Sequence, residues 1–308
     1  DAIFASHEYF GRRDEDRFYD VILIGDSSVW GTLLRPEQTI AGQLNQLNLN
    51  TCDGKPVRFY NLGYPDLSLT KDLIILDEAV QYKPDMILWF VTLESFPYEV
   101  QLSRPLVENN PERVRLLIAD YSLSSLSSES YRLKNRNFFE NTIIGKRRDL
   151  ADLLRLQLYG VMWAATGIDQ YYPEAYPPAQ RDLDPDTAYH GWQEGTTLED
   201  KLAWDVLEAG FRAAGNSKII LINEPILISK GQNSVIRYNF YYPRWAYDAY
   251  RELMQQKAEQ KGWLYYDLWN FTGDSDFTNS AIHMNPSATG EFAKAVWKAV
   301  YSTTCVGQ

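Results

Sequence analysis

The chain has 308 residues, of which 45% are hydrophobic and 23% charged, and its formal net charge is −11 at pH 7. A chain of this length buries roughly three quarters of its unfolded surface, so it can build a large core. The excess of acidic residues argues against nucleic acid or an anionic membrane surface as a partner. No apolar run reaches the length of a transmembrane helix. Because Gly-rich phosphate loops and Cys/His clusters are also absent, we expect neither a cofactor nor a metal.

Five apolar runs are typical of buried strands. They lie at 20–25, 57–62, 85–91, 218–223 and 263–268. Helical patterns fall between most of them, and strands that alternate with helices predict a parallel sheet with helices on its faces. We therefore predict that residues 1–308 form a single α/β domain around a five-stranded parallel sheet.

Prolines mark three of the predicted helices. One helix follows Pro36, another runs from Leu69 to Val80 and ends near Pro84, and the last begins around Pro286. Proline is common in the first turn of a helix, where its missing N–H leaves nothing unpaired. It also disfavours the helical conformation in the residue before it, which explains the stop near Pro84.

The first strand-like run stops abruptly at Gly25-Asp26-Ser27-Ser28. A serine at the carboxyl end of a parallel strand lies in the crevice that open α/β sheets use for ligands. Backbone N–H groups at such a turn can stabilise an oxyanion. Ser27 is therefore a candidate nucleophile, although the same residues are equally typical of a turn that caps a helix.

The interval between the third and fourth strands is too long for one crossover helix. We interpret 96–200 as a helical insertion that caps one side of the crevice, with helices near 113–121, 146–159 and 197–214. Its segment Tyr171 to Pro178 is rich in Tyr and Pro, which suggests a lid or a partner surface. The alternative is a structural excursion that lies far from the site.

Polar residues follow the fourth strand and recur in an aromatic segment beyond it. Asn223 is a candidate oxyanion donor and Glu224 a candidate substrate ligand, although both residue types are also common where a loop starts. The other candidates for substrate binding lie beside strand ends or in the aromatic segment; they are Asp26, Ser28, Glu94, Arg237, Tyr238 and Asn239.

His283 stands just before the last predicted helix. The chain has only 3 His, and imidazole is the side chain that most often acts as a general base. A histidine at the start of a helix is well placed for this role. It is therefore a candidate base for Ser27.

Together these segments resemble the SGNH hydrolase family, also called the GDSL esterases and lipases. Gly25-Asp26-Ser27 matches the first block of the family, Gly63 the second and His283 the last. The resemblance implies a three-layer α/β/α, flavodoxin-like fold in which Ser27 is the nucleophile and His283 the base. It also implies that the N–H groups of Ser27 and Gly63 bind the oxyanion.

The third block departs from the family pattern. The family carries Gly-x-Asn-Asp after its third strand, whereas this chain has Thr92-Leu93-Glu94-Ser95. The asparagine that donates to the oxyanion is therefore absent. The hydroxyl of Thr92 or Ser95 is the candidate replacement, and loss of one such donor commonly slows an enzyme about a hundredfold or more.

The last block departs from the pattern as well. The Asp expected three residues before His283 is Ser280, and the nearest carboxylates upstream are Asp276 and Asp274. We take Asp276 as the candidate partner of His283. A Ser-His dyad with a backbone carbonyl in the orienting role is the alternative, and it occurs in some members of the resembled family.

Two cysteines, Cys52 and Cys305, match no metal-ligand spacing. They can pair as a disulfide if the compartment is oxidising. No signal peptide is recognised, but the first residue is Asp rather than Met, which is compatible with removal of an export signal or a membrane anchor. The location of the protein stays open on the sequence alone.

The sequence predicts a serine esterase or an acyl-transfer enzyme. We expect a small-molecule or carbohydrate ester as substrate. The carbohydrate version follows from analogy with atypical members of the resembled family and from the 21 Tyr and 9 Trp. The alternative is an SGNH scaffold that binds a ligand or an assembly partner without turnover, which the two departures favour.

Overall fold

A computed structural model describes residues 17–127, 130, 132–133, 138–139, 142–166 and 172–305. Its sheet has five strands in the order β2-β1-β3-β4-β5, and every neighbouring pair is parallel. The strands are β1 Tyr19–Ile24, β2 Val57–Asn61, β3 Met86–Val91, β4 Lys218–Asn223 and β5 Leu264–Asp267. This order belongs to the flavodoxin-like doubly wound fold, whose switch point lies between β1 and β3. The predicted α/β fold with a five-stranded parallel sheet is confirmed.

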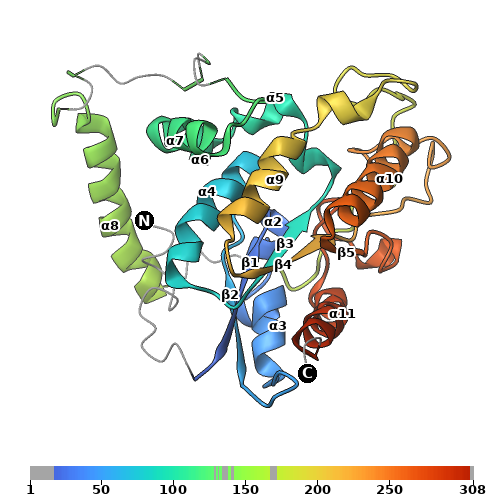
Figure 1. The fold of residues 1–308 in the computed structure, drawn as a ribbon, viewed down its shortest axis with the longest axis horizontal. Helices are drawn as coiled ribbons and strands as arrows, with labels where there is room; N and C mark the ends of the chain where they lie inside the picture. Colours follow the sequence, from blue (N-terminus) through green and yellow to red (C-terminus); the bar gives the residue numbers. More distant parts are fainter. Residues whose placement is uncertain are drawn as a thin grey trace.

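Helices cover both faces of the sheet (Figure 1). One face carries α4 Leu69–Ala79, α9 Trp204–Ala213 and α10 Arg244–Lys261, and the other carries α3 Ile40–Gln46 and α11 Pro286–Cys305. Alternate residues of β1 and β3 therefore enter two separate apolar clusters. Because both faces of these central strands are buried, their sequences are continuously apolar instead of alternating.

The remaining helical elements are short, apart from α7 and α8. They are α2 Ser27–Trp30, η1 Pro36–Gln38, η2 Val80–Tyr82, η3 Leu93–Ser95, α5 Tyr98–Gln101, α6 Pro105–Glu108, α7 Pro111–Tyr121, α8 Arg147–Thr166, η4 Leu198–Lys201 and η5 Asp274–Asp276. The helix expected over 197–214 is interrupted, because Leu202 and Ala203 separate η4 from α9. None of the helices within the described ranges is long and apolar enough to cross a membrane.

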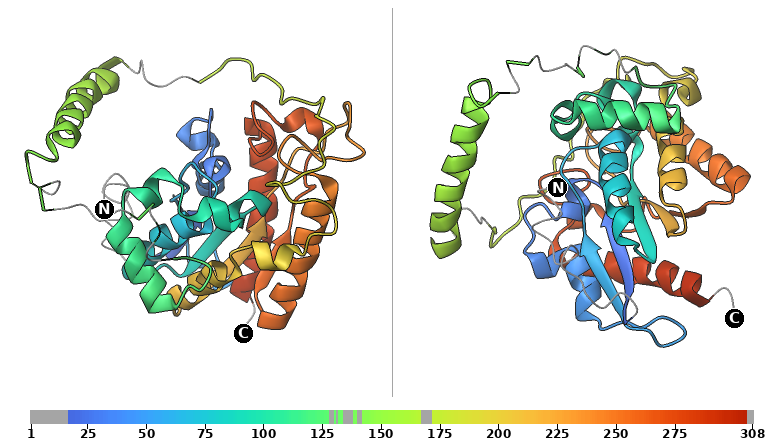
Figure 2. Two further views of the ribbon diagram at one scale, coloured as in Figure 1. Left: turned by 90° about the horizontal axis from the view of Figure 1, so that it is seen from above. Right: turned by 60° about the vertical axis from the view of Figure 1, so that its left-hand side comes forward.

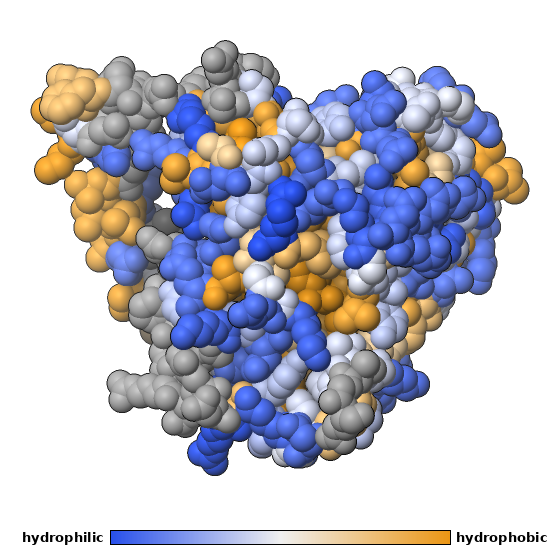
Figure 3. Space-filling model, viewed as in Figure 1, coloured by the Kyte–Doolittle hydropathy of each residue, from blue (hydrophilic) through white to orange (hydrophobic). Residues whose placement is uncertain are grey.

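The segment between β3 and β4 contains helices, as expected, but they are not packed alike. α7 buries Val114 and Leu117, whereas α8 stands apart from the sheet in both views of Figure 2. Apolar side chains gather along α8 in Figure 3, and its Leu153 and Leu158 are exposed. The assignment of 96–200 as a cap over the crevice stays a prediction.

The Tyr- and Pro-rich segment is described from residue 172 onward, so Tyr171 lies outside the described residues. The Tyr176 hydroxyl donates to the Leu33 carbonyl at 3.4 Å, and the Arg35 guanidinium lies 5.7 Å from the centre of the Tyr172 ring. The segment thus contacts the loop that follows α2. Its role as a lid or partner surface stays a prediction.

Cys52 and Cys305 form a disulfide, with Cα atoms 5.3 Å apart. The bond joins the turn before β2 to the last residue of α11, across 253 positions of sequence. A crosslink between residues so far apart in sequence restricts the unfolded chain strongly.

We expect reduction of this disulfide, or the pair of substitutions Cys52→Ser and Cys305→Ser, to lower the free energy of unfolding by about 2–4 kcal/mol. The loss comes from the unfolded chain, so the folded structure should be retained. Urea denaturation of the oxidised and reduced protein measures the difference. Equal midpoints for the two forms would contradict the prediction.

Candidate active site

The turn after β1 presents Ser27 because Gly25 lets two elements approach closely. A Cβ at Gly25 would lie 2.6 Å from Val29 Cγ2 and 3.1 Å from Phe90 Cβ, so any side chain would push α2 away from β3. Asp26 caps α2 by accepting a hydrogen bond from the Ser28 N–H at 2.7 Å. Ser27 is thus the first residue of a helix at the carboxyl edge of the sheet.

Ser27 and His283 are brought together from opposite ends of the chain. Ser27 Oγ lies 2.8 Å from His283 Nε2. Burial lowers the pKa of His283, and the negative charge of Asp26 opposes that shift in part. The imidazole is therefore neutral near pH 7 and can accept the serine proton.

Asn279 occupies the place next to His283 that a carboxylate takes in a catalytic triad. Its Oδ1 lies 3.0 Å from His283 Nδ1. An oxygen at this position requires the proton on Nδ1, which leaves the lone pair of Nε2 facing Ser27. The loop is fixed by the Thr278 N–H, which donates to the His283 carbonyl at 2.8 Å. The sequence reasoning passed over Asn279, because the family spacing directs attention to Asp.

The structure places the two candidate carboxylates elsewhere. Asp276 accepts a hydrogen bond from the Thr272 hydroxyl, and its carbonyl accepts one from the Asn285 N–H at 2.8 Å. Asp274 lies 3.3 Å from Lys230 Nζ. Asp276 therefore stabilises the loop around His283 without contacting the imidazole.

The expected oxyanion donors differ in availability. Ser27 is the first residue of α2, so its N–H has no acceptor within the helix. Gly63 lies against α2, since a Cβ there would meet the Trp30 nitrogen at 2.5 Å. Its N–H donates to Asn61 Oδ1 at 2.9 Å, and Asn61 Nδ2 donates to the Val29 carbonyl at 2.8 Å. Asn61 thus links Gly63 to the helix that carries the nucleophile.

Two of the other predicted donors, Thr92 and Asn223, serve the core instead. The Thr92 hydroxyl is fully buried and donates to the Tyr242 hydroxyl at 3.1 Å. Asn223 Nδ2 donates to Asp267 at 2.8 Å, while its Oδ1 accepts a hydrogen bond from the Tyr247 hydroxyl at 3.2 Å. The structure does not bring either side chain to Ser27 Oγ.

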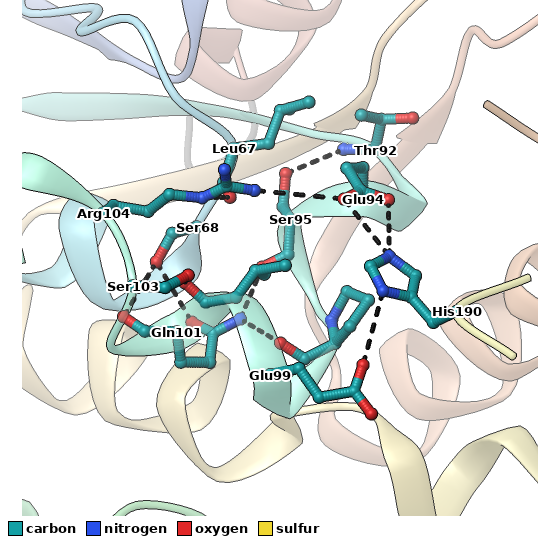
Figure 4. Close-up of polar contacts among 12 residues, drawn as sticks. Leu67, Ser68, Thr92, Glu94, Ser95, Glu99, Gln101, Ser103, Arg104 and His190 are labelled. Carbon is teal, nitrogen blue, oxygen red and sulfur yellow. Dashed lines mark hydrogen bonds and ion pairs between the residues drawn. The ribbon is translucent and has the colours of Figure 1, made fainter. Parts of the chain in front are cut away.

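Glu94 follows β3 and forms the centre of a polar cluster (Figure 4). It accepts a hydrogen bond from the Tyr189 hydroxyl at 2.9 Å and lies 3.0 Å from His190 Nε2 and 3.9 Å from Arg104. Glu99 lies 3.3 Å from the other nitrogen of His190. The predicted substrate ligand Glu94 is thus already surrounded by partners, two of which, Arg104 and His190, sequence reasoning did not single out.

Three other predicted substrate ligands hold the loop that precedes α10. Arg237 donates to the carbonyls of Asn239 and Phe240 at 3.2 and 2.9 Å. Tyr238 donates to Asp248 at 2.7 Å. The buried Asn239 accepts hydrogen bonds from the N–H groups of Tyr241 and Tyr242 through its Oδ1. These interactions stabilise the loop that carries Tyr241.

Tyr241 is half-buried and was not predicted as a site residue. Burial raises its pKa, a hydrogen bond with Ser280 opposes that shift, and the charges of Glu94 and Asp26 add to it. The Tyr241 ring packs beside those of Phe240 and Tyr242, with ring centres 4.5 and 5.7 Å apart. Within a run of tyrosines, the sequence gives no signal that singles this one out.

A buried polar group lies beneath the Ser27 turn. Ser28 donates its hydroxyl proton to Glu224, and both Asp26 and Glu224 are buried. Burial and the nearby Asp26 raise the pKa of Glu224 well above its ordinary value. The fully buried Lys71 donates to the Gly25 carbonyl at 2.7 Å. The predicted substrate ligands Asp26, Ser28 and Glu224 therefore contact one another below the crevice.

No protein-family model matches this sequence, and no curated protein matches it. Solved structures similar to the chain include that of TesA, with a TM-score of 0.46 and 11% identity over 92% of this chain and 98% of that one. A member of the lipolytic protein G-D-S-L family from Veillonella parvula has a TM-score of 0.44 and 9% identity over 91% and 96% of the two chains. Est24, a carbohydrate acetylesterase from Sinorhizobium meliloti, has a TM-score of 0.41 and 12% identity over 92% and 99%. Similarity at this level says nothing about the chemistry of this chain.

We expect His190→Gln to remove a pH-dependent part of the stability. The hydrogen bond to Glu94 raises the pKa of His190 above 6.5. The stabilisation is therefore complete below the pKa of the unfolded state, about 6.5, and is lost as the pH rises through the higher folded pKa. Urea unfolding of both proteins between about pH 5 and about pH 9 measures this. A difference that does not shrink with rising pH would contradict the ion pair.

Proposed function

We propose that this protein is a serine-dependent ester hydrolase of the SGNH type. The observation that carries the proposal is the hydrogen-bonded series Ser27, His283 and Asn279, with distances of 2.8 and 3.0 Å. A hydroxyl, a base and a group that orients the base are the parts that nucleophilic acyl transfer needs. The series lies at the carboxyl edge of the sheet, next to the switch point between β1 and β3.

In the proposed reaction, His283 Nε2 takes the proton of Ser27 as Oγ attacks the ester carbonyl. The imidazolium then gives this proton to the leaving alcohol, and an acyl group stays on Ser27. A water molecule, activated by His283 in the same way, releases the acid and restores the serine. If a sugar hydroxyl replaces that water, the same steps transfer the acyl group.

Two backbone N–H groups are the proposed oxyanion donors. That of Ser27 has no acceptor within α2. That of Gly63 is bonded to Asn61 Oδ1 in this structure. A charged oxyanion competes well for it, because hydrogen bonds to an ionised acceptor are roughly twice as strong as those to a neutral amide.

A carbohydrate ester is the proposed substrate class. Trp30 lies on α2 three residues after the nucleophile, and 54% of its surface is exposed. An exposed indole beside a reacting group offers a flat apolar face on which a sugar ring can pack. Tyr241, whose side chain hydrogen-bonds with that of Ser280, adds a second aromatic ring.

We expect purified protein to hydrolyse p-nitrophenyl acetate, and Ser27→Ala or His283→Ala to reduce kcat below about one thousandth of the wild-type value. Because burial lowers the pKa of His283, kcat/KM should reach its plateau by about pH 7. A fluorophosphonate should label Ser27 stoichiometrically. Equal hydrolysis by all three proteins would exclude the Ser-His mechanism.

The second candidate function is ligand binding without turnover on the same scaffold. The observation that favours it is the neutral Asn279 next to His283, together with Glu94 in the segment where the family has its asparagine. A neutral amide orients the imidazole but does not stabilise its protonated form as a carboxylate does.

Substitution of Asn279 separates the two candidates. In an enzyme, Asn279→Ala should lower kcat at least about tenfold with little change in KM, because the imidazole loses its orienting partner. Asn279→Asp should raise the pKa of His283 and shift the acid limb of kcat/KM upward by about one unit. The binding function would be supported if the wild-type protein does not react with fluorophosphonate and the Asn279→Asp variant gains no activity.

A further inference from the structure

The base of the proposed mechanism lacks a carboxylate partner in hydrogen-bonding contact. The neutral Asn279 holds Nδ1, and Asp276 is bonded to Thr272 and Asn285. When His283 takes the proton of Ser27 it becomes a cation in a half-buried place. Charge in such a place needs a counter-charge, because solvent does little to stabilise it.

Asp26 is the carboxylate next to the reacting pair, because it directly precedes Ser27, whose Oγ lies 2.8 Å from His283 Nε2. Its negative charge opposes the lowering of the pKa of His283 by burial. Asp26 is itself buried and accepts the Ser28 N–H at 2.7 Å, so its carboxyl group is held at the first turn of α2. It also precedes the nucleophile in sequence, which keeps it beside the reacting pair.

Glu224 lies against Asp26 and lacks a partner for one oxygen. Its Oε2 accepts the Ser28 hydroxyl, whereas its buried Oε1 has no hydrogen-bond donor nearby. Asp26 and Glu224 both bond to Ser28, Asp26 through the Ser28 N–H and Glu224 through the Ser28 hydroxyl, so their buried carboxyl groups lie close together. Two ionised carboxylates in contact repel each other and leave Oε1 unsatisfied. A proton on Oε1, donated to Asp26, satisfies both groups.

The surrounding charges agree with one proton in this pair. Lys71 is the buried cation that acts on Glu224, but its ammonium lies 2.5 Å from Asp72 and donates to two backbone carbonyls. Burial raises the pKa of Tyr247, with a further contribution from the charge of Glu224, so Tyr247 is a neutral phenol. Lys71 is already in contact with Asp72, so two further buried anions would share a single ammonium, whereas one anion at Asp26 has the imidazolium of His283 as its counter-charge.

We propose that Asp26 stabilises the protonated form of His283 and that Glu224, as a neutral acid, holds Asp26 in place. Asn279 then orients the imidazole, and Asp26 supplies the charge that a triad carboxylate would supply from the other side. Asp26 and Glu224 are positioning residues, since both act through His283 and do not touch substrate. No proton moves between them during turnover. The inference rests on the proposed role of His283 as the base.

The test is an NMR titration of the histidine rings in the full chain, which has only 3 His. We compare the wild type with Asp26→Asn, Glu224→Gln and Asp276→Asn, the last as a matched control that removes a charge nearer in sequence. The first two substitutions keep the shape and the acceptor that the Ser28 N–H or hydroxyl needs. His283→Ala identifies the resonance.

We expect Asp26→Asn to lower the pKa of His283 by about one unit, and Glu224→Gln and Asp276→Asn to change it by less than about a third of a unit. An unchanged pKa of His283 in the Asp26→Asn variant would overturn the role of Asp26. A shift in Glu224→Gln as large as that in Asp26→Asn would show that Glu224 is ionised, which would overturn its assignment as a neutral acid.

A second measurement does not depend on Asp26→Asn folding. If Glu224 is protonated in the folded protein, the folded-to-unfolded ratio of the wild type must fall relative to Glu224→Gln as the pH rises above about 4.5, by up to about tenfold per pH unit. A constant ratio would overturn the proposal. Neither measurement requires turnover, so an inactive protein that shows both effects would refute the esterase function and leave the charge arrangement standing.

Discussion

The position of the nucleophile depends on close packing around two glycines. A Cβ at Gly25 would lie 2.6 Å from Val29 Cγ2, and one at Gly63 would lie 2.5 Å from the Trp30 nitrogen. Contacts that short cannot be relieved locally, because protein interiors have almost no free volume. The four-residue helix α2 is therefore held between the end of β1 and the end of β2. Ser27 stands at its first position, where the loop before α11 brings His283.

The polar groups below this turn form a second constraint. Lys71 donates to the carbonyls of Gly25 and Tyr64, which are the residues that follow β1 and Gly63. A single buried ammonium thus ties the two glycine-bearing turns together, and its charge is balanced by Asp72. Such a network is stable only while each member is satisfied. The geometry of the Ser27 site therefore depends on the ionisation of the residues beneath it.

Polar residues at the end of β4 and in the loop before α10 proved hard to interpret from sequence. Asn223, Arg237 and Asn239 have the chemistry of oxyanion donors and substrate ligands, yet each is used to hold the aromatic core or the loop before α10. The reason is general. A loop at the edge of a sheet has many unpaired backbone groups, and a buried Asn or Arg is as suitable for those as for a substrate. Only the contacts show which use is made.

The sequence by itself determined the five strands, their parallel arrangement and the Gly-Asp-Ser turn, because burial on both faces and steric limits at glycine act over a few neighbouring residues. It also placed His283 before a helix. The tertiary structure decided which groups meet. It set Asn279 and not Asp276 on the imidazole, and it buried Glu224 against Ser28, next to Asp26. Partners of this kind depend on how loops separated by up to 256 positions fold back onto one edge of the sheet, and hydrogen-bond direction over a few ångströms leaves no periodic trace in the sequence.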